Sequence, residues 1–346
     1  MKKIIPLCVA AALTLSACSS ADEAADSAQN AASKASSAAS SAADGDSTEG
    51  KNGKGGASRV VDTELGEVEV PASVESVVVL TGTRDLDIAL SLGLPVTGYP
   101  KAPDAFDLDS PLAEEIKQAK EDGAKPLYTA GDEEADIAAI NKADPDLIIG
   151  FVHDVIPIRE ELEDIAPVLP IDDFATGTWQ DNLMLVASAT GTERQGGSLI
   201  ADYEKRVGKL SDKYADVLAE HKFAPVSYDG EEFIINGTRL LSQVLQDLGA
   251  EPSAAFNEAL EGVTGKYDIE EIAKALDDVD GLVALVNEKS TWQSLQSNAQ
   301  FGKIPAVQNE TVVRSDEQTH EGAYYSAMHA VDIIEELLEM LDTENK

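Results

Sequence analysis

The chain has 346 residues, and its 64 Asp and Glu against 26 Lys and Arg give a formal net charge of −38. So acidic a protein repels nucleic-acid phosphates and anionic lipid headgroups, which excludes broad contact with either. Both cysteines, Cys8 and Cys18, lie within the first 18 residues. A zinc, iron–sulfur or disulfide framework and a cysteine nucleophile are therefore excluded from the folded part.

The N-terminus carries the pattern of a secretory signal. Lys2 and Lys3 precede an apolar run over residues 4–13, and the tetrad Leu-Ser-Ala-Cys follows at residues 15–18. Such a segment is too short for a transmembrane helix. We predict a signal peptide over residues 1–17. The tetrad resembles the lipobox of bacterial lipoproteins, which implies that Cys18 is lipidated. The alternative is an ordinary signal peptide with a chance cysteine.

A linker follows the signal peptide. Residues 19–58 are rich in Ala, Ser, Asp and Gly and contain no aromatic residue, Leu, Ile or Val. Because such a composition cannot form a core, we predict a lipid-anchored flexible tether over residues 18–58. An Ala-rich helix is the alternative, which the Ser, Asp and Gly content disfavours.

The remaining residues, 59–346, alternate short apolar runs with helical patterns. Runs typical of buried strands occur at residues 77–80, 147–149, 233–235 and 282–286. This alternation predicts an α/β fold with mostly parallel sheets.

Two patterns occur twice along the chain. The first pattern is the end of a strand, then Gly-Thr-Arg, then a helix. It occurs as LTGTRDLDIALSLG at residues 80–93 and as INGTRLLSQVLQDLG at residues 235–249. The second pattern is a helix, an acidic turn and a strand. It occurs as IAAINKADPDLIIGFV at residues 137–152 and as IEEIAKALDDVDGLVALV at residues 269–286. Because both matches occur in the same order, we predict two Rossmann-like lobes of similar build.

A long amphipathic helix is predicted between the halves. Apolar residues recur at spacings of three and four over residues 193–221. Gly196, Gly197 and Gly208 weaken this pattern, so the helix could begin near Ser198. The predicted organisation is an N-terminal lobe (59–192), one bridging helix (193–221) and a C-terminal lobe (222–346), with a cleft between the lobes.

Arg84 and Arg239 hold matching places, each after a strand and at the start of a helix. Helix N-termini favour anions, and the arginine fork adds charge-assisted hydrogen bonds. Ligands of parallel α/β sheets collect at the carboxyl ends of strands. One arginine in each lobe could therefore clamp an anionic ligand. The alternative is a pair of structural arginines, for instance with Arg84 paired to Asp85 or Asp87.

Two tryptophans in predicted loops or at helix starts, and three tyrosines, are further candidates for the cleft, since aromatic faces suit the rings and apolar parts of a ligand. Ordinary packing is the alternative for each of them. These residues are Trp179, Trp292, Tyr99, Tyr228 and Tyr324.

The four histidines are scattered, without the spacing of a metal site. His153 and His320 could each face the cleft, and a haem receptor would use a His or Tyr as axial ligand. We expect no permanently bound cofactor or metal. The sequence also lacks Gly-x-Ser-x-Gly, Gly-Lys-Ser/Thr and His-Glu-x-x-His motifs, which disfavours an enzyme such as a secreted hydrolase.

Several segments together resemble the siderophore/vitamin B12-type substrate-binding proteins of ABC transporters, over residues 59–346. They are VESVVVLTGTRDLDIALSLGLPVTGY, DPDLIIG, IAPVLPID, the long helix and KIPAVQNETVVRSD. The resemblance implies a monomeric, lipid-anchored receptor on the outer face of the cytoplasmic membrane. It would capture a ferric siderophore, an anionic chelate carrying Fe3+, and deliver it to a permease driven by an ATPase.

The same resemblance implies that exposed acids on each lobe dock onto permease arginines. By position these are Glu160 and Glu161 in the N-terminal lobe and Glu270 and Glu271 in the C-terminal lobe. Stabilisation of helix N-termini alone also explains these acids. Two other functions stay open from the residues: a haem-binding receptor of the same kind, and a surface adhesin or structural lipoprotein without a small ligand.

Overall fold

The computed structural model describes residues 57–101, 110–129, 135–172 and 177–344. They belong to one compact unit, Gly55–Lys346. The predicted signal peptide, Cys18 and almost all of the predicted tether lie outside the described residues. The tether boundary at residue 58 is wrong, because Ser58 already belongs to a strand. The described part of the chain contains no helix both long and apolar enough to span a membrane.

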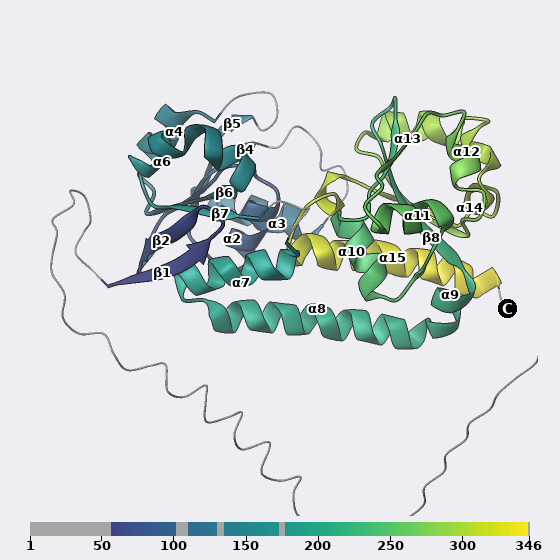
Figure 1. The fold of residues 1–346 in the computed structure, drawn as a ribbon, viewed down its shortest axis with the longest axis horizontal. Helices are drawn as coiled ribbons and strands as arrows, with labels where there is room; N and C mark the ends of the chain where they lie inside the picture. Colours follow the sequence, from purple (N-terminus) through teal and green to yellow (C-terminus); the bar gives the residue numbers. More distant parts are fainter. Residues whose placement is uncertain (1–56, 102–109, 130–134, 173–176, 345–346) are drawn as a thin grey trace, which may run out of the picture. The chain divides into compact units, whose positions relative to one another are not determined.

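The N-terminal lobe contains a parallel five-stranded sheet in the order β5-β4-β3-β6-β7 (Figure 1). An antiparallel hairpin of β1 (Ser58–Thr63) and β2 (Gly66–Pro71) precedes it. The sheet strands are β3 (Val77–Val79), β4 (Val96–Lys101), β5 (Lys125–Thr129), β6 (Leu147–Phe151) and β7 (Val168–Ile171). The helices are α2 (Arg84–Ser91), α3 (Pro111–Glu121), α4 (Ile137–Ala143), α5 (Val152–Val155), α6 (Arg159–Glu163) and α7 (Trp179–Thr190), with the 3-10 turn η1 (Ile156–Ile158).

Both faces of this sheet are covered, which explains why its strands are continuous apolar runs in the sequence. Val77 and Val79 pack into the main core, whereas Val78 between them packs into a second core on the opposite face. Successive side chains of a strand point to opposite faces, so a strand covered on both sides reads as a continuous hydrophobic run. The predicted strands at residues 77–80 and 147–149 are confirmed, with β3 ending one residue earlier.

The C-terminal lobe contains a six-stranded sheet with the order β11-β9-β8-β12-β13 and β10 beside β8. Its strands are β8 (Lys222–Tyr228), β9 (Phe233–Ile235), β10 (Glu251–Pro252), β11 (Gly265–Tyr267), β12 (Gly281–Leu285) and β13 (Val312–Ser315). The helices are α10 (Leu240–Asp247), α11 (Ala254–Leu260), α12 (Ile272–Ala275), α13 (Lys289–Gln296), α14 (Pro305–Gln308) and α15 (Tyr324–Glu344), with 3-10 turns η2 (Phe301–Lys303) and η3 (Glu317–Thr319).

Strands β8, β12 and β13 are parallel, but β9 and β11 pair antiparallel. The strand predicted at residues 233–235 is therefore present as β9 but lies outside the parallel part of the sheet. Only residues 229–232 separate β8 from β9, and Gly230 adopts a φ of 109° in that turn. Parallel neighbours need a long crossover, so this short turn dictates a hairpin.

The predicted single bridging helix is two helices. Helix α8 (Glu193–Lys213) ends before Tyr214, whose φ of −114° and ψ of 25° leave the helical range, and α9 (Ala215–Glu220) follows. The helix begins at Glu193 rather than near Ser198. Gly196 lets α8 approach α7 closely, because a Cβ there would lie only 3.1 Å from Cβ of Ala187.

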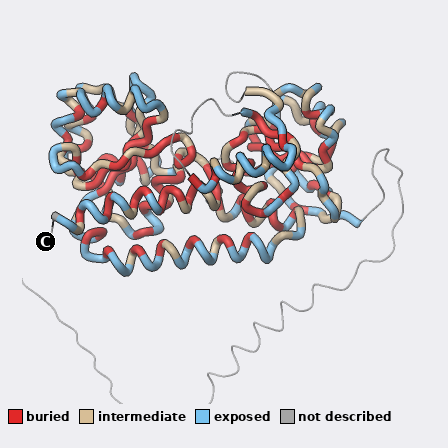
Figure 2. The backbone as a smooth tube through the Cα atoms, turned by 180° about the vertical axis from the view of Figure 1, so that it is seen from behind, coloured by how far each residue is buried: buried red, intermediate tan, exposed pale blue. Residues whose placement is uncertain are grey.

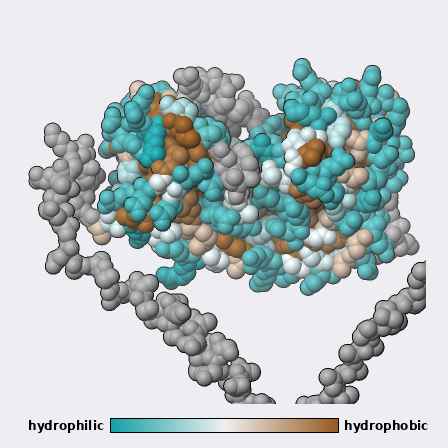
Figure 3. Space-filling model, viewed as in Figure 1, coloured by the Kyte–Doolittle hydropathy of each residue, from teal (hydrophilic) through white to brown (hydrophobic). Residues whose placement is uncertain are grey.

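A second helix joins the lobes. Helix α15, yellow in Figure 1, contacts α2 and α3 of the N-terminal lobe as well as α10, β12 and β13 of the C-terminal lobe. Figure 2 shows the outer side of the long helix α8 exposed, while the sheets are buried. Figure 3 shows hydrophilic residues covering most of the visible face, as the charge of −38 leads one to expect. The lobes are therefore tied by α8 and by α15.

Candidate functional site

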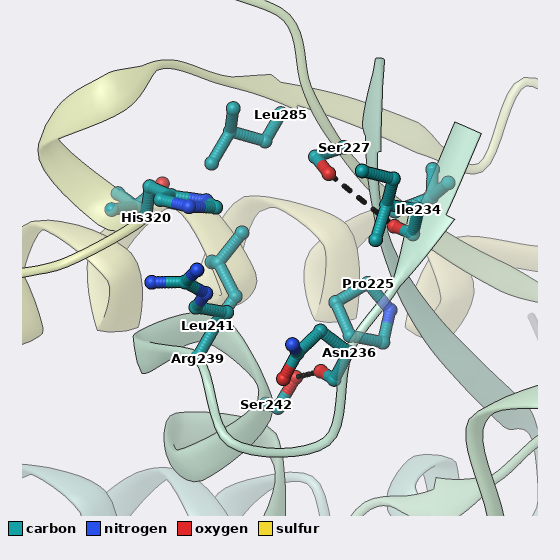
Figure 4. A pocket seen from close by; sticks show the side chains of 11 residues that line it. Pro225, Ser227, Ile234, Asn236, Arg239, Leu241, Ser242, Leu285 and His320 are labelled. Atoms are coloured by element: carbon teal, nitrogen blue, oxygen red, sulfur yellow. Dashed lines mark hydrogen bonds between the residues drawn. The ribbon is translucent and has the colours of Figure 1, made fainter. Parts of the chain in front are cut away.

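A pocket of about 140 Å³ lies in the C-terminal lobe, at the carboxyl ends of the parallel strands β8 and β12 (Figure 4). Strand and turn residues form one wall, and Arg239, at the start of α10, and His320 lie on the opposite side. The residues that line it are Pro225, Val226, Ser227, Ile234, Asn236, Arg239, Leu241, Ser242, Leu285, Thr319 and His320. The pocket thus combines apolar and neutral polar side chains with one cationic side chain, Arg239.

Arg239 is the charged group of this pocket. Its side chain is 29% exposed, and its Nη1 pairs with Oε1 of Glu321, whose side chain is 15% exposed. Burial raises the pKa of Glu321 to about 7, although the charges of Arg239 and Arg84 pull in the opposite direction. Burial and the charge of Arg239 lower the pKa of His320 to about 4, so this imidazole is neutral at pH 7.

Arg84 occupies a different environment from its counterpart. Its side chain is completely buried, and Nε donates to the carbonyl oxygen of Gly322 at 3.1 Å. The two arginines therefore approach one segment, residues 320–322, from different lobes. The expected clamp is wrong for Arg84, because a fully buried side chain cannot contact a ligand in this conformation. Arg239 alone of the two lines the pocket.

Asp85 explains why the two Gly-Thr-Arg repeats differ. Its carboxylate accepts hydrogen bonds from the backbone N–H groups of residues 80–83 and of Leu86. In the N-terminal lobe the N–H groups of the loop before α2, and one in the first turn of α2, are therefore occupied by Asp85 and do not face a ligand. Leu240 holds the matching place in the C-terminal repeat and has no carboxylate. Burial raises the pKa of Asp85 to about 6, against these hydrogen bonds.

The predicted aromatic residues divide into buried and partly exposed groups. Trp179 is completely buried and packs edge-on against Tyr203 at a centroid distance of 5.1 Å, and Tyr99 is only 3% exposed. The expectation that these two line a cleft is therefore wrong. Trp292, Tyr228 and Tyr324 are partly buried. Tyr228 stacks on Phe233, at the end of β8 near the pocket, with its hydroxyl bonded to the carbonyl of Gly230.

The histidines do not form a metal site. His153 is exposed, stacks on Phe151 and lies 3.3 Å from Asp154, whereas His320 lines the pocket beside Arg239. Among the described residues, no group of three or more His, Cys, Asp or Glu side chains is placed to hold a metal ion.

The four predicted docking acids are exposed. Glu160 and Glu161 lie in the first turn of α6. Glu270 and Glu271 precede α12 rather than opening it, and both of their backbone N–H groups donate to Asp268. The helix start that we expected at these two residues is therefore wrong by a residue or two.

Sequence reasoning missed part of the pocket lining. Ser227, Leu285 and Thr319 come from strand ends and from η3, and only the tertiary fold shows that they meet. Asn236 could have been identified, because it directly precedes Gly-Thr-Arg in the repeat. Its Oδ1 accepts the backbone N–H of Thr238 at 2.8 Å and so shapes the turn that carries Arg239.

The fold and pocket define a bilobal α/β ligand-binding protein. Residues 81–319 match the family model described as periplasmic binding protein, and the chain belongs to this family. Relatives include the probable siderophore-binding lipoprotein YfiY of Bacillus subtilis, 36% identical over 42% of each chain. This match thus spans less than half of that relative's length. The ferric enterobactin-binding periplasmic protein FepB of Escherichia coli is 26% identical over 64% of this chain and 71% of its own.

A solved structure supports the same assignment. The siderophore periplasmic binding protein from the fuscachelin gene cluster of Thermobifida fusca is 27% identical, with a TM-score of 0.63. The similarity covers 78% of this chain and 98% of that one. The predicted resemblance and the two-lobe α/β fold class are thereby confirmed.

Proposed function

We propose that this chain is the substrate-binding component of an ABC importer and captures an anionic ferric siderophore without catalysing a reaction. The observation that carries the proposal is the position of Arg239 among apolar and neutral polar side chains in a pocket at the carboxyl ends of β8 and β12. It is supported by the relatives, since YfiY and the Thermobifida protein are described as siderophore-binding and FepB as binding ferric enterobactin.

The pocket would hold one part of the ligand. Its volume of about 140 Å³ is below the roughly 300–1,000 Å³ of typical ligand sites, so a chelate must extend beyond it. We propose that the ligand reaches the interlobe cleft, with Trp292, Tyr228 and Tyr324 as aromatic contacts. The Fe3+ would be cargo held by the siderophore's own oxygen atoms, and neither His153 nor His320 needs to coordinate it.

The proposed location is the outer face of the cytoplasmic membrane. A lipid on Cys18 would anchor the chain, and the segment up to residue 57 would hold the monomeric folded part away from the bilayer. Support comes from the signal-like N-terminus and from the word lipoprotein in the name of YfiY.

We also propose that Glu160 and Glu161, together with Glu270 and Glu271, dock onto the permease, whose ATPase drives import. All four side chains are exposed to solvent. Exposed ion pairs contribute only about 0–1 kcal/mol each, so such docking would be weak and reversible.

A fluorescence titration tests the proposed function. The mature chain is titrated with ferric enterobactin, a neutral ferric trihydroxamate, ferric citrate, haem and cobalamin while tryptophan emission is followed. We expect saturable quenching by an anionic ferric complex. A chain that binds none of these compounds, as an adhesin would, contradicts the proposal, and selective binding of haem would replace it with the alternative receptor.

A further inference from the structure

The ion pair between Arg239 and Glu321 places an acidic side chain beside the cationic group of the pocket. An anionic ligand that approaches Arg239 therefore meets a competitor for the same guanidinium. Both side chains are largely shielded from water, so the competition is stronger than it would be between exposed charges. Three outcomes are open to Glu321 on binding: it can stay as a repelling charge, move away, or lose its charge.

Burial of Glu321 and the neighbouring acid Glu317 favour loss of its charge, whereas the charges of Arg239 and Arg84 oppose it. The charged and titratable groups around it are Arg239 at the start of α10, Arg84 on α2, the adjacent His320 and Glu317 on η3. Movement of the backbone at Glu321 is restrained, because the carbonyl oxygen of the next residue, Gly322, accepts the hydrogen bond from buried Arg84. Two residues further on, α15 begins, and its first N–H groups are bound by buried Asp87.

We propose that Glu321 is a displaceable counterion: an anionic ligand group takes over Arg239, and the Glu321 carboxylate takes up one proton from solvent as the ligand binds. The inference rests on the proposed function. It makes Glu321 a specificity-determining residue that favours anionic complexes over neutral ones and couples their binding to pH.

The sign of the coupling follows from the charges. In the free protein, the carboxyl of Glu321 titrates near neutral pH, and Arg239 helps to keep it ionised. Once the ligand neutralises Arg239 and adds its own negative charge, the protonated form is favoured further. Affinity for an anionic complex should therefore rise about tenfold per pH unit as the pH falls from about 8.5 to 7.5. It should level off below about pH 6, where Glu321 is already protonated.

Calorimetric titration with ferric enterobactin tests this coupling. At pH 8, in buffers of different ionisation enthalpy, the wild-type protein should take up about one proton per ligand. Glu321→Gln should take up none, lose the pH dependence of affinity and bind about tenfold more tightly than wild type at pH 8. Glu288→Gln is the matched control, since Glu288 is exposed near the carboxyl end of β12 and its side chain bonds Ser290 rather than Arg239.

Two results would overturn the inference while leaving the proposed function intact. The first is tight binding of ferric enterobactin by wild type without proton uptake. The second is proton uptake that persists in Glu321→Gln and disappears in His320→Gln, which would assign the proton to the imidazole. Failure of wild type to bind any ferric complex would instead overturn both proposals. The number of protons that wild type takes up per ligand is measured without any variant. The test therefore remains valid even if a variant does not fold.

Discussion

Oδ2 of Asp87 in the N-terminal lobe accepts the backbone N–H of Ser326 in α15 at 2.9 Å. The same carboxylate accepts the N–H groups of Ala323 and Tyr325, and its side chain is completely buried. An acid at a helix N-terminus satisfies donors that have no partner within the helix and interacts favourably with the helix dipole. Asp87 therefore holds the N-terminus of α15, the helix that contacts both lobes, in place. This N-terminus lies close in sequence to Glu321, which pairs with Arg239.

Asp87→Ala should destabilise the protein. Removal of the carboxylate leaves three backbone N–H groups buried without their acceptor, so we expect a loss of at least about 2 kcal/mol in the free energy of unfolding. Urea unfolding measures this loss. Asp212→Ala removes an exposed acid of α8 and should leave stability almost unchanged. Equal stability of both variants would show that Asp87 does not fasten α15.

The arginines should separate into a ligand residue and a structural residue. Arg239→Ala should weaken binding of an anionic ferric complex by about 1.5–3 kcal/mol, the scale of a charge-assisted hydrogen bond, with a smaller effect on unfolding. Arg84→Ala should chiefly lower stability, because Arg84 is buried against Gly322. Arg194→Ala, which removes an exposed arginine of α8, is the control for net charge. Normal affinity in Arg239→Ala would remove Arg239 from the site.

Trp179 should behave as a core residue. Its indole is completely buried beside Tyr203, so Trp179→Phe should lower the free energy of unfolding, on the order of 1–2 kcal/mol, through lost packing. Ligand affinity should stay the same, as judged by the quenching of the remaining Trp292. A large loss of affinity in a variant that is otherwise folded would return Trp179 to the binding site.

The charge of Glu321 should also be visible in stability without any ligand. Its pKa is raised to about 7 in the folded protein, so its stabilising contribution is present at low pH and lost as the pH rises through 7. Glu321→Gln should therefore gain stability relative to wild type as the pH rises from about 4.5 to about 7, whereas Glu288→Gln should not. Thermal unfolding at several pH values gives the comparison, and parallel curves would contradict the shifted pKa.

The two glutamate pairs should matter for delivery of the ligand to the permease and not for binding of the ligand. Replacement of Glu160 and Glu161, or of Glu270 and Glu271, with Ala should leave ligand affinity intact and reduce uptake by cells. The control removes Asp212 and Asp216, two exposed acids of α8 and α9. If uptake is unchanged when both glutamate pairs are absent, these residues are not the docking points.

The apolar runs and the repeats were sufficient to predict the fold class, because buried parallel strands and strand–helix alternation are local patterns. The antiparallel pairing of β9 depends on the short turn at Asp229 and Gly230, which the repeat does not reveal. The burial of Arg84 could not be predicted, since it depends on Gly322, which is 238 residues away in the chain. The contact of α15 with the N-terminal lobe could not be predicted either. Asp87, which binds the start of this helix, is one of 64 acidic residues and carries no sequence signal that sets it apart.

The most direct test of the central claim compares one anionic and one neutral iron complex on wild type and Arg239→Ala. Calorimetry at neutral pH should show that wild type binds ferric enterobactin, or another anionic ferric chelate, more tightly than a neutral ferric trihydroxamate. Arg239→Ala should lose about tenfold or more of the affinity for the anionic complex, with a smaller change for the neutral one. Equal loss for both complexes, or no binding of any ferric complex by wild type, would contradict a receptor that recognises an anionic iron chelate through Arg239.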